Sequence, residues 1–299
     1  MLWGQTTFDE CVATVHAAVA AGINLLDLAP RYGDGKAEQV VGAAFGGRLP
    51  EGVHITSKCN LGMPAPDRVE VILRQSIETS LRLLQRDRLD IFFLHSNLVP
   101  DEHPMWNAPD VSRLTALSLF RSHVRPVFEK LKAERIVGAW GLTGIGHPDA
   151  IIEVLAEDPK PLAVQCIANL LDSPGGLKFF DGPAKPRAIM AAAKANGVAI
   201  MGIRAVQAGA LTAAIDRDLP ADHPERRDYA KAAGYRAFCA EIDEDPALIA
   251  HRYALTLPID TLVLGVKNRS ELAGCIAAAA AGPLPPDVVA RIDATVAQG

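Results

Sequence analysis

Four residues of complementary chemistry stand at the ends of short apolar stretches of the chain, or in the turn after one: Asp27, Tyr32, Lys58 and His95. A carboxylate, a phenol, an ammonium and an imidazole are together suited to moving a proton to or from a carbonyl or alcohol oxygen. A phenol is a weak acid at neutral pH, but a neighbouring ammonium stabilises its phenolate form and a carboxylate holds that ammonium in place. An imidazole can donate a hydrogen bond to the same oxygen. These four residues are the candidate catalytic group.

The elements that would bring the four residues together alternate along the chain. Eight apolar stretches are typical of buried parallel strands, and helical patterns lie between them. The stretches are Met1–Gly4, Ile23–Leu28, Val53–Lys58, Leu89–His95, Ile136–Leu142, Leu162–Ile167, Val198–Ile203 and Thr261–Leu264. The alternation predicts an α/β fold, and eight strands favour a closed (β/α)8 TIM barrel over a doubly wound sheet. Such a barrel gathers the carboxyl ends of its strands on one face, where the four candidates would meet.

The remaining organisation follows from the same pattern. We expect one (β/α)8 domain over residues 1–299, with a truncated first strand because the chain enters that strand at Met1. Helices are expected between the strands, including Lys36–Phe45, Pro148–Ala156 and a helix that opens at Ser270. A long polar loop is expected over Ser96–Asp110.

Composition excludes several classes of function. The chain has 299 residues, 49% of them apolar, and a net charge of −5, so nucleic acid is not expected as a partner. Five scattered cysteines without a C-x-x-C pair, and histidines without a metal-binding pair, predict no metal and no disulfide framework. Polar residues interrupt the apolar run Val12–Ala29, so no membrane span is expected. With no signal peptide in view, the protein is expected to be cytoplasmic and to act on a small molecule.

The spacing of the four candidates resembles that of the aldo-keto reductase superfamily. The chain has Asp-x-Ala-x-x-Tyr-Gly from Asp27, Ile-Thr-Ser-Lys ending at Lys58, and Leu-Asp-x-x-x-Leu-His ending at His95. The resemblance implies a metal-free barrel in which Asp27, Tyr32, Lys58 and His95 form the catalytic tetrad and Tyr32 is the general acid or base. It also implies NADP(H) and hydride transfer to or from an aldehyde, ketone or sugar-like substrate. The fuller motif Asp-x-Ala-Pro-x-Tyr-Gly-x-Gly is most similar to bacterial members that oxidise aldoses.

Segments after the later strands resemble the family's cofactor-binding motifs. They imply cofactor contacts from Thr143, Gln165, Asn169, Arg204, Gly265, Lys267, Arg269 and Glu271. Lys267 and Arg269 suit the 2′-phosphate of NADP(H), whereas Glu271 would repel it, so NAD(H) is the alternative cofactor. Ile203 stands where the family usually stacks an aromatic ring on the nicotinamide.

Two other functions and one substrate-binding hypothesis remain open at this point. The first alternative is a Schiff-base lyase with Lys58 as its nucleophile. Such a lysine must be desolvated or lie beside another cation, so the expected pairing of Lys58 with Asp27 argues against a lyase. A regulatory barrel that binds cofactor without turnover is suggested by the short first strand and by Ile203. In the polar loop, His103 and Trp106 are candidates for a substrate pocket, with a solvated loop as the alternative.

Overall fold

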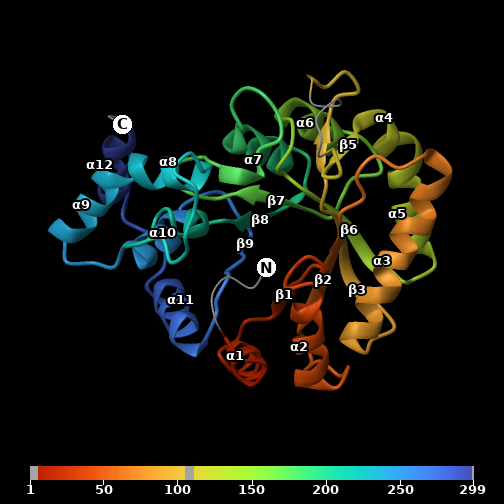
Figure 1. Ribbon diagram of the computed structural model, residues 1–299, viewed down its shortest axis with the longest axis horizontal. Helices are drawn as coiled ribbons and strands as arrows, with labels where there is room; N and C mark the ends of the chain where they lie inside the picture. Colours follow the sequence, from red (N-terminus) through yellow and green to blue (C-terminus); the bar gives the residue numbers. More distant parts are fainter. Residues whose placement is uncertain (1–5, 105–110, 298–299) are drawn as a thin grey trace.

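The computed structural model describes residues 6–104 and 111–297 of the chain, and it contains a curled parallel sheet with helices around its outside (Figure 1). The main sheet has seven strands, each paired with the next: β1 (Leu25–Asp27), β2 (His54–Cys59), β3 (Leu89–Leu94), β6 (Val137–Thr143), β7 (Ala163–Ile167), β8 (Ala199–Ile203) and β9 (Thr261–Leu262). Every pairing is parallel, and helices occupy the crossovers. The predicted (β/α)8 fold class is confirmed. The Met1–Gly4 stretch, predicted as the first strand, lies outside the described residues.

The main helices of the described residues lie between successive strands or flank the sheet: α1 (Phe8–Ala20), α2 (Lys36–Phe45), α3 (Val69–Leu84), α5 (Arg125–Ala133), α6 (Pro148–Ala156), α7 (Pro186–Ala195), α10 (Pro246–Ala254) and α11 (Arg269–Ala281). Shorter or additional helices are α4 (Leu117–Leu119), α8 (Pro224–Lys231), α9 (Ala233–Glu241) and α12 (Pro286–Ala297). Helix α11 begins one residue before the predicted Ser270. Asn268 is its N-cap, because the Asn268 side chain accepts a hydrogen bond from the backbone N–H of Glu271.

The segment predicted as a polar loop contains part of a second, two-stranded sheet. Strand β4 (Asn97–Val99) pairs in parallel with β5 (Leu114–Ala116), and all six residues are buried. Strands of three residues are too short to give a periodic signal, so the sequence prediction of a loop over Ser96–Asp110 was wrong for these positions. Strands β1 and β9 are likewise shorter than predicted.

Alternate residues of the strands divide the core in two. Phe93, Ala163 and Met201 form a cluster inside the sheet, with Leu25, Ile91, Ala199 and Val263 packed against them. The neighbouring Phe92 belongs instead to the larger cluster between the strands and the helices. This two-residue period is the one that a barrel wall requires, because one side chain of each pair fills the interior.

Helices α1 and α11 lie side by side next to the two end strands of the sheet, β1 and β9 (Figure 1). Glu10 of α1 forms an ion pair with Arg269 of α11, and the Thr6 hydroxyl donates to the backbone oxygen of Lys267 at 3.0 Å. These contacts join α1 and the residues before it to α11 and the residues before that helix.

The packing of α2 against α3 requires a glycine. A Cβ atom at Gly42 would lie 2.1 Å from the backbone oxygen of Leu83, which is far closer than any side-chain carbon can approach. The three nearest atoms are all backbone atoms of Leu83 and Leu84 in α3, so no side chain can rotate to make room. Helix α2 begins at Lys36, directly after the turn that carries Tyr32.

We therefore expect Gly42→Ala to lower the free energy of unfolding by roughly 2–3 kcal/mol, since the added methyl forces the two helices apart. Gly274→Ala is the matched control. A Cβ at Gly274 in α11 would lie 3.6 Å from a Leu248 methyl, an ordinary contact, and alanine favours the helix. Urea denaturation checks both variants. Equal stabilities for the two would contradict the packing argument.

Candidate active site

Lys58 lies at the centre of the site, fully buried at the end of β2. Its Nζ donates to Asp27 Oδ2 at 2.6 Å, to the backbone oxygen of Leu28 at 2.9 Å and to the Tyr32 hydroxyl at 3.3 Å. All three ammonium protons therefore have acceptors. Burial alone would lower the pKa of Lys58, but the Asp27 carboxylate and then Tyr32 outweigh burial, and the pKa lies above its ordinary value. Lys58 is an ammonium at neutral pH.

Asp27 ends β1 and is held on every side. Its side chain is 5% exposed. Its Oδ2 faces Lys58, while its Oδ1 accepts from the Thr56 hydroxyl at 2.5 Å and from Gln165 Nε2 at 2.7 Å. Thr56 is opposite Asp27 in the strand register, so β2 supplies two of its partners and β7 the third. These three donors fix the orientation of the carboxylate, which cannot rotate away from Lys58 without losing them.

Tyr32 reaches the site from a tight turn after β1. The turn is held by hydrogen bonds from Tyr32 N to Ala29 O at 2.9 Å and from Gly35 N to Pro30 O at 2.8 Å. Gly35 has a φ of 83°, a conformation that favours glycine. The Lys58 Nζ also lies 4.8 Å from the centre of the Tyr32 ring. Lys58 Nζ thus contacts both the hydroxyl and the ring of Tyr32.

His95 follows β3, and its backbone N–H donates to Cys59 O at 2.7 Å. Its ring meets the Tyr32 ring edge-on, with centroids 6.0 Å apart. Desolvation of the partly buried ring, and then the charges of Lys58, Arg31 and Arg113, lower the pKa of His95 to about 3. The imidazole is therefore neutral over the physiological range and has one N–H to donate. The structure brings all four predicted catalytic residues together.

Two of the predicted cofactor residues line the same region. Thr143 ends β6 opposite Gln165 of β7, and Gln165 binds Asp27 directly. The Thr143 hydroxyl is buried and has no hydrogen-bond partner within the described residues. Gly144 follows, and a Cβ there would lie 2.7 Å from Gln165 O, so no larger side chain fits. Thr143 thus offers an unsatisfied polar group beside the site.

Asn169 and Arg204 form hydrogen bonds and an ion pair with other residues of the chain. Asn169 is fully buried and donates to Ser173 O and Arg204 O, both at 3.1 Å. Arg204 donates to Gln207 at 2.8 Å and pairs with Glu225 at 3.0 Å. Burial lowers the pKa of Arg204 despite the Glu225 carboxylate. The structure shows these two residues as ties between the loops after β7 and β8.

The last predicted segment, Gly265 to Glu271, carries its charges in pairs. Lys267 Nζ lies 2.5 Å from Asp216 and 3.1 Å from Glu271. Arg269 Nη2 lies 2.9 Å from Glu10. Gly265 is exposed, and a Cβ there would meet open space. Both candidate cations for a phosphate thus already contact carboxylates.

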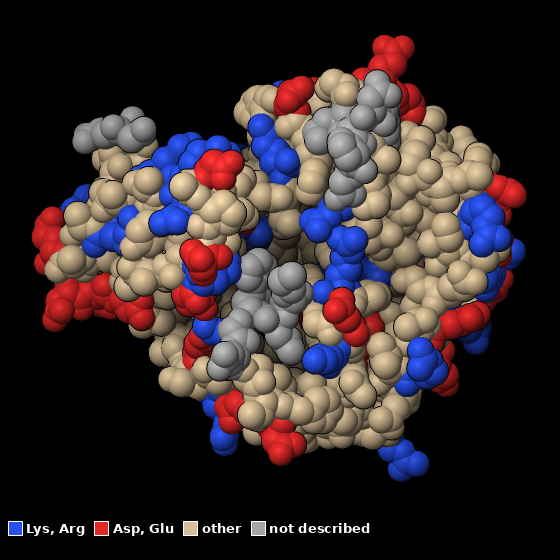
Figure 2. All heavy atoms as spheres, in the orientation of Figure 1, with Lys and Arg blue, Asp and Glu red and all other residues tan. Residues whose placement is uncertain are grey.

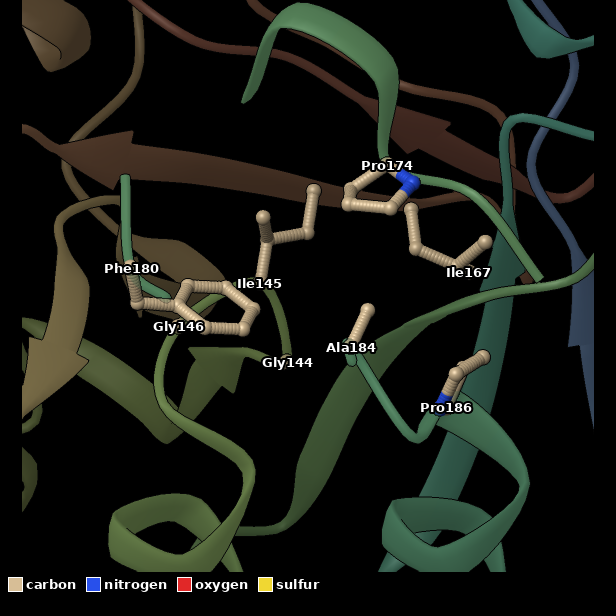
Figure 3. A pocket seen from close by; sticks show the side chains of 8 residues that line it. All are labelled: Gly144, Ile145, Gly146, Ile167, Pro174, Phe180, Ala184 and Pro186. Carbon is tan, nitrogen blue, oxygen red and sulfur yellow. The ribbon is translucent and has the colours of Figure 1, made fainter. Parts of the chain in front are cut away.

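The proposed substrate-pocket residues lie partly outside the description. Trp106 is outside the described residues. His103 is buried, and burial, then the nearby His147, lower its pKa. A separate small pocket lies beyond the ends of β6 and β7 (Figure 3), and it is lined by Gly144, Ile145, Gly146, Ile167, Pro174, Phe180, Ala184 and Pro186. It is apolar, includes none of the four catalytic candidates and is too small for a dinucleotide.

Three residues that sequence reasoning missed act on the site. Thr56 fixes Asp27, as described above, and Arg31 and Arg113 add positive charge around His95. Arg113 O accepts from Asn97 N at 2.7 Å, which places β5 beside the segment after His95. The position of Arg31 beside Tyr32 was the available signal, whereas Arg113 is 18 positions from His95 along the chain and depends on the unpredicted sheet.

Figure 2 shows lysine and arginine side chains around a hollow near the middle of the face drawn, although the net charge is −5.

The described residues include no group of three His, Cys, Asp or Glu side chains arranged to hold a metal ion. In the same part of the chain, no helix has the length and apolar character needed to cross a membrane.

Comparison with known proteins decides the family. The family model described as "Aldo/keto reductase family" matches residues 1–297. The chain belongs to the aldo/keto reductase family. Members of this family are nicotinamide-dependent oxidoreductases of aldehydes or sugars.

Individual relatives of this aldo/keto reductase are distant. Over 110 residues, 34% of the chain, it is 34% identical to the aldo-keto reductase YhdN of Bacillus subtilis, of which it covers 33%. Over 280 residues, 93% of the chain, it is 25% identical to L-galactose dehydrogenase of Arabidopsis thaliana, of which it covers 80%. The holo form of aldo-keto reductase AKR11C1 from Bacillus halodurans superposes with a TM-score of 0.70 at 20% identity, covering 97% of this chain and 88% of that one.

The electrostatics of His95 predict a pH dependence of stability. Its pKa is lowered on folding from 6.5 to about 3, so the folded protein binds fewer protons than the unfolded chain between these values. The contribution of neutral His95 to the free energy of unfolding is therefore fully present above pH 6.5 and is lost as the pH falls towards 3. We expect His95→Gln to reduce the loss of stability between pH 6.5 and 4 by roughly 1–2 kcal/mol. Denaturation curves at several pH values test this, and parallel pH profiles for the two proteins would contradict it.

Proposed function

We propose that this aldo/keto reductase transfers a hydride between a nicotinamide cofactor and an aldehyde, ketone or sugar-like substrate, with Tyr32 as the general acid or base. The observation that carries the proposal is the hydrogen bond from the buried Lys58 ammonium to the Tyr32 hydroxyl. A phenol is useful as a proton donor at neutral pH when a fixed positive charge stabilises the phenolate left behind. Asp27 keeps that charge in place.

The proposed roles follow from the geometry. In the reducing direction, Tyr32 gives the proton of its hydroxyl to the substrate's carbonyl oxygen and becomes a phenolate beside Lys58. The neutral His95 imidazole donates a hydrogen bond to the same oxygen and so orients the carbonyl. The bound cofactor supplies the hydride to the carbonyl carbon. Water then restores the proton of Tyr32, whose side chain is partly exposed.

The region beside the tetrad fits the polar end of a nicotinamide cofactor. The unpaired buried hydroxyl of Thr143 would bind a carboxamide, and Gln165 lies next to it in the register. For the adenosine end, the motif from Gly265 to Glu271 supports NADP(H), through Lys267 and Arg269. Those two cations already contact Asp216 and Glu10, so preference for NADP(H) requires its 2′-phosphate to displace the carboxylates.

A sugar substrate is supported by two observations. The Asp-x-Ala-Pro-x-Tyr-Gly-x-Gly motif is similar to that of aldose-oxidising members, and one relative that matches 93% of the chain is an L-galactose dehydrogenase. With a sugar, the direction reverses: Tyr32 as phenolate accepts the proton of the hydroxyl that is oxidised.

The environment of Lys58 disfavours the lyase alternative. A Schiff-base nucleophile must be an uncharged amine, and burial or a second cation has to lower its pKa. Here the pKa of Lys58 is raised, because Asp27 and Tyr32 outweigh burial. All three of its protons are also engaged.

Tyr32→Phe tests the chemistry. The variant removes the transferable proton and keeps the ring, so kcat should fall by about 10²–10⁴-fold, the usual contribution of a positioned general acid. Cofactor affinity should stay within about twofold, because Tyr32 acts on the substrate oxygen. The measurements are NADPH and NADH oxidation with a panel of aldehydes, NAD(P)⁺ reduction with aldoses, and cofactor fluorescence for binding.

Tyr229→Phe is the matched control, since its lost hydroxyl donates to the backbone oxygen of Ala213 and to none of the four tetrad residues. Its kcat should match the wild type. A Tyr32→Phe enzyme as fast as wild type would overturn the mechanism. Cofactor binding without turnover in the wild type would support the regulatory barrel, and borohydride trapping that requires substrate would support the lyase.

A further inference from the structure

Glu10 holds Arg269 by more than one contact. Arg269 Nε lies 3.1 Å from Glu10 Oε1, Arg269 Nη2 lies 2.9 Å from Glu10 Oε2, and the backbone N–H of Arg269 also donates to Oε1 at 3.1 Å. Glu10 is in the first turn of α1 and Arg269 opens α11, 259 positions later. The Arg269 side chain is 61% exposed, so solvent and solutes can reach this pair.

The Glu10 carboxylate accepts hydrogen bonds from a guanidinium and from a backbone N–H at the start of a helix, and proteins bind phosphate with the same groups. A guanidinium binds carboxylate and phosphate oxygens in the same two-pronged geometry. The free N–H groups at the start of a helix favour any anion. Hydrogen bonds from the Arg269 side chain, and then from its backbone, lower the pKa of Glu10, so its carboxylate is ionised at neutral pH. In this structure an internal carboxylate therefore takes the position that an anionic ligand would need.

We propose that Glu10 is a cofactor-specificity residue that disfavours NADP(H) relative to NAD(H) by competing for Arg269. The inference rests on the proposed function, in which the segment from Gly265 to Glu271 receives the adenosine end of the cofactor. The 2′-phosphate of NADP(H) must displace Glu10 from Arg269 and then lie near its negative charge. NAD(H) has a hydroxyl there, which does not compete for the guanidinium and can donate to a carboxylate, as in other dinucleotide sites.

The second cation of the segment strengthens the inference. Lys267 contacts both Asp216 and Glu271, and Glu271 Oε2 also accepts from Lys267 N at 2.8 Å. A 2′-phosphate would thus meet three carboxylates around two cations. Among the three, Glu10 is the one that pairs with Arg269, and it does so through both of its oxygens.

The test is the ratio of the NADPH and NADH dissociation constants, measured by cofactor fluorescence without substrate. Glu10→Gln is chosen because its amide oxygen can still accept from Arg269, which preserves the contact between α1 and α11 while removing the charge. We expect roughly tenfold tighter NADPH binding, with NADH changed less than about twofold. A purely structural contact would change both affinities together.

Two further variants show whether the effect is local. Asp9→Asn removes the same charge from the neighbouring position of the same helix, and its ratio should equal that of the wild type. Glu10→Gln combined with Arg269→Gln should lose the gain in NADPH affinity, because the gain depends on the released guanidinium.

An unchanged ratio in Glu10→Gln would overturn the inference while leaving the proposed function intact. So would an equal gain in Asp9→Asn, which would indicate a general effect of net charge. Failure of the wild type and all variants to bind either dinucleotide would contradict the proposed function, and the inference with it.

Discussion

The ion pair between Lys58 and Asp27 is the interaction on which the rest of the site depends. A lysine with no exposed surface costs several kcal/mol in lost hydration unless its charge is matched, and removing one partner of such a pair costs roughly 3–5 kcal/mol. Here the match comes from three strands of the sheet, of which two are neighbours and the third lies across the barrel. Asp27 belongs to β1 and Lys58 to β2, while Gln165 of β7 donates to Asp27 across the barrel. The hydrogen bond from Gln165 to Asp27 requires the sheet to curl, and the turn after β1 brings Tyr32 to the same ammonium.

The same constraint explains the arrangement around the tetrad. Gly35 permits the turn that returns the chain to the site, and Gly42 lets the next helix approach α3 closely. His95 is kept neutral by desolvation and by the nearby cations, so it has an N–H to donate and adds no further positive charge to the site. Next to the two end strands of the sheet, the pairing of Glu10 with Arg269 joins α1 to α11 and places a carboxylate where we propose that the adenosine end of a cofactor binds. A contact that closes the fold there also bears on cofactor choice.

The sequence predicted the features that depend on local order. Strand and helix alternation, the confirmed barrel fold and the convergence of Asp27, Tyr32, Lys58 and His95 all follow from apolar stretches that end in polar residues. Features that depend on register or on distant contacts were not predictable in this way. Thr56 becomes a partner of Asp27 through the pairing of β1 with β2, and Arg113 reaches the site through strands too short to recognise. Asn169 and Arg204 match cofactor motifs by type, but only the structure shows that their hydrogen bonds tie two loops together.

The central claim is that Lys58 acts on catalysis through Tyr32, and a double-mutant cycle on kcat tests it most directly. The cycle compares wild type, Tyr32→Phe, Lys58→Met and the double variant, each checked for folding by circular dichroism. If the ammonium serves to stabilise the phenolate, it has no role once the hydroxyl is gone, and the double variant should be within about threefold of Tyr32→Phe alone. Losses that multiply, so that the double variant is slower than Tyr32→Phe by the full factor seen for Lys58→Met alone, would contradict the account.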